Sequence, residues 1–171
     1  MSSKLENTAE IPEEYDRAMA RALNLLARRQ HAARELETKL LRTFEQPVIQ
    51  RVLARLSELG HVDDPAFARE YARQRFKRSP RAALAVVSEL IKRGVRRGTA
   101  EEAVALVLAE EGLEENLLAE TAARKKLASF QNLKPSEQKV RLFRFLSSRG
   151  FAKAAALRAV KRILEPTGKN N

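Results

Sequence analysis

Apolar residues recur along this chain at the spacing of amphipathic helices, and three stretches repeat the same pattern. Each repeat reaches a large apolar residue after a turn, at Phe44, Val95 and Phe151, so these residues are 51 and 56 positions apart. Apolar or small residues follow each of them at the fourth, fifth, eighth and ninth positions, which lie on one face of a helix. A repeat of this length predicts about three helices.

Helical periodicity covers most of the chain, and no segment predicts a strand longer than a few residues. The expected helices lie at 15–29, 31–41, 47–59, 64–77, 80–93, 99–111, 114–130, 135–149 and 152–165. Prolines near several starts and glycines after several ends support these limits. The pattern therefore predicts an all-α fold, an elongated array of three tandem three-helix modules with about nine helices.

The same reading divides the chain into five segments. We expect a flexible leader at 1–14, three modules at 15–60, 61–112 and 113–165, and a disordered tail at 166–171, because the two ends lack apolar anchors. An array of this kind binds a partner along its length and does not enclose a small substrate.

Composition excludes several classes of protein. The chain has no cysteine, so it forms neither a disulfide framework nor a thiolate metal site. No apolar run approaches the roughly 20 residues that span a bilayer, and the N-terminal stretch is polar and acidic. The sequence shows no phosphate-binding glycine loop and no carboxylate pair placed for acid–base chemistry. We expect a cytoplasmic protein that is not an enzyme and has no cofactor.

Charge is distributed unevenly along the chain, whose formal net charge is +11. Residues 1–68 carry a net charge of −1, residues 69–98 carry +8, residues 99–123 contain seven glutamates and no basic residue, and residues 124–162 carry +11. Two basic blocks of this density favour a polyanionic or acidic partner. The alternative is an ordinary solvated helical surface, and the sequence does not say which block faces the partner.

The candidate partner-binding or DNA-binding residues are the basic residues of these two blocks. In the first block they are Arg69, Arg73, Arg75, Lys77, Arg78, Arg81, Lys92 and Arg93. In the second they are Arg124, Lys125, Lys126, Arg141, Arg144, Arg149, Arg158, Lys161 and Arg162.

Three local patterns allow more than one interpretation. Asp63 and Asp64 precede a proline, which favours helix capping over a metal site because no further ligand stands at a suitable spacing. Phe67 and Tyr71 are four residues apart among arginines; they could stack on bases, but core packing is favoured. The segment from Thr99 to Glu102 matches a capping box that would start the helix at 99.

One stretch of the chain combines several specific motifs: Val62-Asp63-Asp64 with Phe67, Tyr71, Arg73 and Arg75, followed by Pro80-Arg81, Glu89-Leu90 and Gly94-Val95. These motifs resemble the RecX family, and the resemblance extends over about residues 17–164. The chain departs from the family at Thr43-Phe44, where a glycine is usual before the aromatic residue, at His61, and in the loop at 76–79, which lacks glycines.

This resemblance implies a regulator of the RecA recombinase. RecX proteins bind the RecA filament on single-stranded DNA, lie along its groove, and suppress ATP hydrolysis, strand exchange and coprotease activity. The implied partners are the RecA filament and, through weak salt-dependent contacts, single- or double-stranded DNA; a monomer and no membrane are expected. The alternative is a helix-turn-helix-like nucleic-acid-binding protein that acts independently of RecA.

Overall fold

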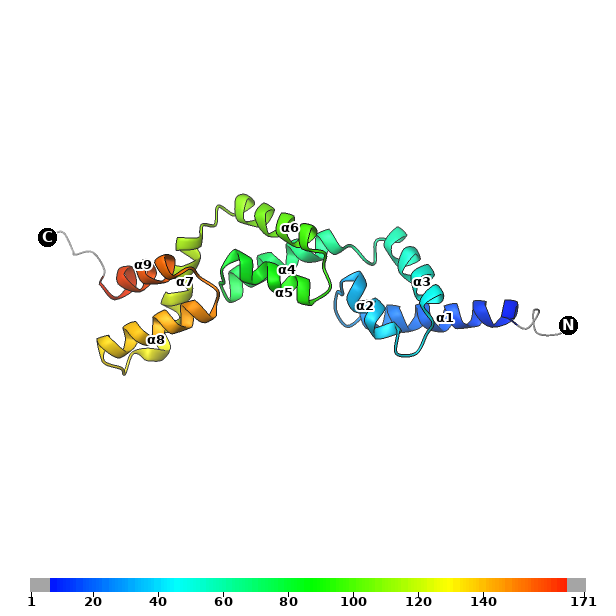
Figure 1. Ribbon diagram of the computed structural model, residues 1–171, viewed down its shortest axis with the longest axis horizontal. Coiled ribbons are helices and arrows are strands. Elements are labelled where there is room, and N and C mark those ends of the chain that lie inside the picture. Colours follow the sequence, from blue (N-terminus) through cyan, green and yellow to red (C-terminus); the bar gives the residue numbers. More distant parts are fainter. Residues whose placement is uncertain (1–6, 166–171) are drawn as a thin grey trace.

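The computed structural model describes residues 7–165, which form one elongated row of helices (Figure 1). These residues contain nine α-helices, one short 3₁₀ turn and no strand, which confirms the all-α prediction. The predicted tail at 166–171 and residues 1–6 of the predicted leader lie outside the described residues. The elements are α1 (Asn7–Leu26), α2 (Ala33–Leu40), α3 (Gln46–Glu58), α4 (Asp64–Arg78), α5 (Ala83–Lys92), α6 (Arg97–Glu110), α7 (Glu115–Leu127), η1 (Ala128–Phe130), α8 (Pro135–Ser148) and α9 (Lys153–Leu164).

The first helix begins earlier than the sequence pattern predicts. α1 starts at Asn7, inside the stretch expected to be a flexible leader, and ends at Leu26. Glu14 Oε1 accepts a hydrogen bond from the backbone N of Glu45 at 3.4 Å, and Tyr15 packs against the first core. These contacts hold the early part of α1 against α3, so the helix continues into the predicted leader.

The predicted capping box at Thr99 and Glu102 is wrong. α6 begins two residues earlier, at Arg97, and its N-cap side chain makes no capping hydrogen bond. The preceding Val95 is fully packed in the core, and Ala100 in the first turn of α6 must face that same core. Thr99 therefore lies inside the first turn of α6 and is not its N-cap.

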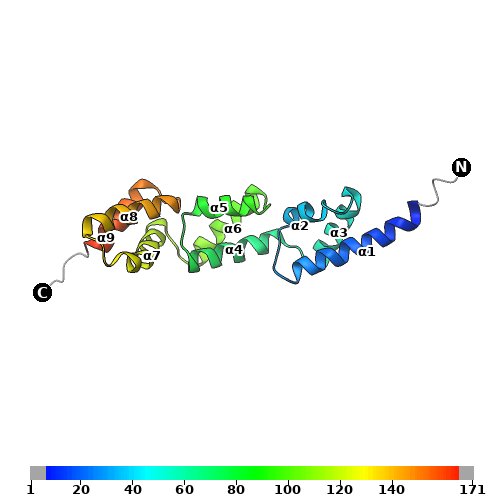
Figure 2. The same cartoon turned by 90° about the horizontal axis from the view of Figure 1, so that it is seen from below.

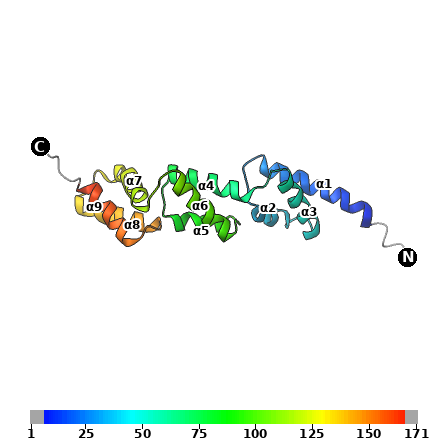
Figure 3. The same ribbon diagram turned by 90° about the horizontal axis from the view of Figure 1, so that it is seen from above.

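The helices lie in three parallel series along the long axis. α1, α4 and α7 follow one another along one edge, and α2, α5 and α8 follow one another along the other (Figures 2 and 3). α3, α6 and α9 complete the three groups, and each packs on the first helix of its own group. The repeat in the sequence thus becomes a translation along the molecule.

The series α8, α5, α2 is joined end to end through two glycines. Gly94 ends the turn after α5 with φ +95°, and a Cβ built there would lie 2.9 Å from Arg34 Cβ at the start of α2. Gly150 ends the turn after α8 with φ +84°, and a Cβ there would lie 3.0 Å from Ala85 Cβ in α5. We call the contact between α5 and α2 at Gly94 the first joint, and the contact between α8 and α5 at Gly150 the second joint. At each joint the negative C-terminal end of one helix meets the positive N-terminal end of the next.

The buried apolar residues form two clusters of unequal size. One cluster of buried residues belongs to α1, α2 and α3 together with Val62. A second cluster runs without interruption through α4 to α9 and also includes Ala32. The second and third groups of helices thus share one core, whereas Ala32 alone extends that core into the first group.

Candidate functional site

Several predicted contact residues are already paired with glutamates inside the protein. Arg75 donates two hydrogen bonds to the Glu89 carboxylate, at 2.7 and 2.9 Å, and Arg81 Nη1 lies 3.1 Å from the same group. Tyr71 Oη donates a third hydrogen bond to Glu89 at 2.7 Å. These contacts join α4 to α5, so Arg75 and Arg81 hold the second module together.

The charge of Glu89 is strongly favoured in the folded state. Burial acts to raise its pKa, but the hydrogen bonds from Arg75 and Tyr71 and the positive charge of both arginines outweigh burial, and the pKa lies below its usual value. The carboxylate thus stays ionised under neutral conditions and neutralises part of the surrounding positive charge.

The lowered pKa of Glu89 predicts how the stability of the protein depends on acid pH. Because the pKa of Glu89 is lower in the folded protein than the 4.5 of an unperturbed glutamate, its contribution is complete above pH 4.5 and is lost as the pH falls through the folded value. In the variant Glu89→Gln, the free energy of unfolding should therefore fall less steeply as the pH decreases. The number of protons taken up on acid unfolding, which sets this slope, should drop by up to about one. Denaturant unfolding across acid pH would measure this; an unchanged slope would contradict it.

Arg73 ties α4 to the end of α6. Its guanidinium lies 3.1 Å from Glu110 and 2.9 Å from Glu111, with Glu70 at 3.5 Å. A charge reversal here or at Arg81 would place a carboxylate against glutamates, so such a variant would test folding and not partner binding. Neither residue is a clean probe of the interface.

Arg149 lies at the second joint in a more repulsive setting. Burial lowers its pKa, and the positive charges of Arg81 and Arg75 lower it further. It donates a hydrogen bond to the Ser79 hydroxyl, and its guanidinium lies 4.8 Å from the centre of the Phe145 ring. Arg81 Nε nearby is buried and has no hydrogen-bond partner in the described part of the chain. The joint therefore has an excess of cationic donors over acceptors.

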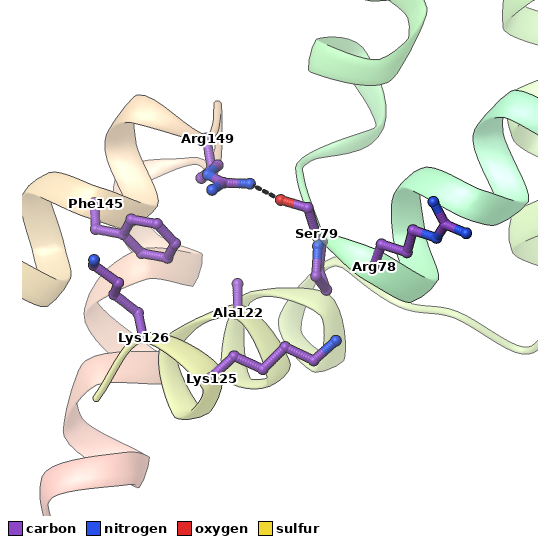
Figure 4. Close-up of a pocket in the computed structure, with 8 residues that line it drawn as sticks. Arg78, Ser79, Ala122, Lys125, Lys126, Phe145 and Arg149 are labelled. Atoms are coloured by element: carbon purple, nitrogen blue, oxygen red, sulfur yellow. Dashed lines mark hydrogen bonds between the residues drawn. The ribbon is translucent and has the colours of Figure 1, made fainter. Parts of the chain in front are cut away.

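Ser79, Phe145 and Arg149 line a small cleft between α4, α7 and α8, which we term the second-joint cleft (Figure 4). Its volume is about 210 Å³, below the roughly 300 to 1,000 Å³ of typical small-molecule pockets. No carboxylate lines it, so its chemistry suits a single anionic group such as a phosphate or a carboxylate. The lining residues are Arg78, Ser79, Pro80, Ala122, Lys125, Lys126, Phe145 and Arg149.

Two lysines of α7 complete the cleft in different ways. Lys125 Nζ donates to the carbonyl of Lys77 at 2.8 Å, and so bridges α7 to the C-terminal end of α4. Lys126 Nζ lies 5.8 Å from the centre of the Phe145 ring and points toward it (Figure 4). Arg149 and Lys126 thus both lie within cation–π distance of the Phe145 ring.

The remaining predicted residues are spread over the surface. Arg158 donates to Asn116 and Arg162 pairs with Glu120, so both tie α9 to α7. Arg141 lies 6.0 Å from the Phe130 ring. Lys77, Arg124, Arg144 and Lys161 are exposed, Arg69 is half-buried, and Lys92 and Arg93 lie at the first joint.

The first module contributes basic residues that the sequence analysis missed. Arg34, Lys39 and Arg42 line a groove at the first joint together with Lys92 and Arg93. The acidic residues elsewhere in residues 1–68 reduce the net charge to −1 and hide this local concentration. The available signal was the grouping of three cations within nine positions around a single short helix.

The aromatic and aspartate patterns have structural roles. Phe67 is buried, and the Tyr71 ring lies under Arg93, whose guanidinium is 4.7 Å from the ring centre, which confirms the core interpretation. Asp63 accepts from the backbone N of Ala66 at 2.8 Å and caps α4, as predicted. Asp64 instead accepts from the backbone N of Ala33 at 2.8 Å, so it caps α2 of the preceding module.

Among residues 7–165, no three His, Asp or Glu side chains come together in a way that could hold a metal ion. Within the same residues, no helix has the length and apolar content needed to cross a membrane.

Comparison with known proteins gives one consistent result. Residues 18–56 match the family model described as "RecX, first three-helix domain", and residues 63–104 match "RecX, second three-helix domain". The chain is 40% identical to "Regulatory protein RecX" of Pelodictyon phaeoclathratiforme over 135 residues, which cover 78% of this chain and 81% of that protein. It is 34% identical to "Regulatory protein RecX" of Chlorobaculum tepidum, over 86% of this chain and 88% of that protein.

A solved structure supports the fold. The crystal structure of RecX from Lactobacillus salivarius superimposes with a TM-score of 0.71, covering 89% of this chain and 97% of that one, at 19% identity.

Proposed function

Since the chain belongs to the RecX family, we propose that it binds the filament that RecA forms on single-stranded DNA and inhibits ATP hydrolysis, strand exchange and coprotease activity. It acts as a monomeric, non-enzymatic regulator in the cytoplasm. Its effect comes from binding, because a ligand that prefers one state of an assembly shifts the equilibrium toward that state.

The observation that carries this proposal is the second-joint cleft within an elongated array. Four cations, Arg78, Lys125, Lys126 and Arg149, line it without a carboxylate among them. An array with such a cleft at one joint and further cations at the other can contact more than one subunit of a filament. Its affinity for a filament then exceeds its affinity for a single subunit.

The alternative, a helix-turn-helix-like protein that reads duplex DNA, is less favoured. Such a protein places a recognition helix, often the third of its module, in the major groove. In the second module that helix is α6, which exposes Glu101 and Glu102 in its first half. Phosphates would repel these side chains.

The proposal is tested by measuring RecA ATP hydrolysis on single-stranded DNA while the protein is titrated in. We expect inhibition at protein concentrations below that of RecA, because each array spans several subunits. Absence of inhibition at a salt concentration where the filament is intact would refute the proposal. Tight, RecA-independent binding to duplex DNA without inhibition would favour the alternative.

A further inference from the structure

A second basic depression lies at the first joint, between α2 and the turn that follows α5. We term it the first-joint groove. Its volume is about 480 Å³, more than twice that of the second-joint cleft. Figures 2 and 3 show α2 and α5 following one another at this point of the array. The groove is lined by Arg34, Glu35, Thr38, Lys39, Arg42, Ile91, Lys92, Arg93 and Gly94.

Positive charge in the first-joint groove is largely uncompensated. Five of its lining residues are cations, and the one carboxylate, Glu35, is held by Arg29 from outside the groove and lies 3.1 Å from His31 Nδ1. Lys39 reaches Glu35 only at 4.0 Å. Among residues 13–165, whose side chains are described, Arg34, Arg42 and Lys92 take part in no salt bridge. Like charges gathered in this way repel one another, and a bound anion would relieve the repulsion.

Two contacts at the joint position parts of the groove lining. Gly94 lies against Arg34 and the backbone N of Glu35, so the turn after α5 is pressed onto the first turn of α2. Arg93 is oriented by the Tyr71 ring beneath its guanidinium. The groove thus combines residues from two modules whose relative position is set by direct backbone packing, and it exists only when the joint is formed.

The lining indicates what kind of polyanion fits. Protein–protein interfaces have an apolar, aromatic-rich centre, whereas nucleic-acid interfaces are more polar and much more positively charged. In the first-joint groove Ile91 is the one large apolar residue, and there is no aromatic ring on which a base could stack. We infer that the first-joint groove binds backbone phosphates of a nucleic acid directly, without reading its sequence.

This contact goes beyond the proposed function, since it requires no recombinase. It adds to the array a nucleic-acid contact to which the first module contributes Arg34, Lys39 and Arg42, at a joint distinct from the second-joint cleft. Phosphate contacts of this kind position a protein on a backbone and weaken steeply with salt.

The experiment measures fluorescence anisotropy of a labelled oligothymidylate as the full chain is titrated in, without RecA. The double variant Arg42→Ala, Lys92→Ala removes two exposed groove cations that make no salt bridge. We expect binding to weaken roughly 5- to 10-fold at low salt and the slope of log affinity against log salt to become shallower by about 1.4. The matched control, Arg17→Ala with Arg21→Ala, removes the same charge from exposed positions of α1 outside the groove, and should change affinity by less than about twofold.

Several results would overturn the inference. Equal weakening in both double variants would reduce the effect to net charge, and absence of binding by the unmodified chain would remove the contact altogether. Competition by polyglutamate as effective as unlabelled oligothymidylate would assign the first-joint groove to an acidic protein. Displacement by a low excess of ATP would assign it to a free nucleotide. Because RecA is absent, none of these outcomes depends on whether the chain inhibits the recombinase.

Discussion

Replacing Gly94 by alanine should lower the free energy of unfolding by about 3 kcal/mol. Gly94 has φ +95°, a region that L-residues enter at a cost of roughly 1 to 2 kcal/mol. In addition, the new Cβ would lie 2.9 Å from Arg34 Cβ and 3.1 Å from the backbone N of Glu35. Neither is the tip of a flexible side chain, so the first joint must shift, and overpacking of this kind typically costs 1 to 3 kcal/mol.

Two other glycines provide matched controls for the cost of placing alanine at positive φ. Gly60 has φ +71° and Gly112 has φ +60°, and a Cβ at either position would meet nothing within 4 Å. Alanine at these positions should cost only about 1 kcal/mol, the conformational part alone. Denaturant unfolding followed by circular dichroism would give all three values. Equal losses at Gly94, Gly60 and Gly112 would show that the close approach at the first joint contributes nothing.

Reversing charge in the second-joint cleft should abolish most of the inhibition of RecA without destabilising the protein. In the double variant Arg78→Glu, Lys126→Glu we expect the concentration for half-maximal inhibition to rise roughly tenfold or more, since like charges placed across an interface cost several kcal/mol. The cleft has no carboxylate to be repelled by the new side chains. Arg78 and Lys126 lie in the last turns of α4 and α7, where a carboxylate is unfavourable by roughly 0.3 to 1 kcal/mol, and relief of repulsion among the cleft cations offsets this cost. Thermal stability should therefore change little.

The control for this variant has the same change in net charge elsewhere. Arg17→Glu with Arg21→Glu alters two exposed residues of α1 that line neither the second-joint cleft nor the first-joint groove. Inhibition of RecA ATP hydrolysis should remain within about twofold of the unmodified chain. If both double variants lose inhibition equally, the second-joint cleft is not the contact. If the cleft variant inhibits normally, the contact lies elsewhere on the array.

The sequence pattern predicts the helices well because each helix must bury one face. Of the three large apolar residues that mark the repeat, Val95 and Phe151 are buried, whereas Phe44 is half-buried against the first core. Where local and tertiary requirements compete, the local pattern misleads. Thr99 has the right neighbours for a cap, but the helix begins at Arg97 and places Thr99 in its first turn, one residue before the buried Ala100.

The candidate site was harder to predict because pairing depends on contacts between helices. Glu89 meets Arg75 across 14 positions and Arg73 meets Glu111 across 38, and no local spacing reveals either pair. The sequence therefore identified basic blocks but not which arginines were already neutralised. The concentration of Arg34 and Arg42 with Lys92 arises only when the first joint is formed, so net charge per segment could not show it.

The end-to-end series of α8, α5 and α2 gives the array a direction of growth. A further module after α9 would bring the end of its second helix to the free start of α8, as Gly150 meets α5. A module before α1 would need a close turn at the free end of α2, but Thr43 stands there and no residue other than glycine has positive φ in the described chain. The turn after α2 therefore does not adopt the backbone conformation in which Gly94 and Gly150 make their close contacts, and the series of joints has one direction.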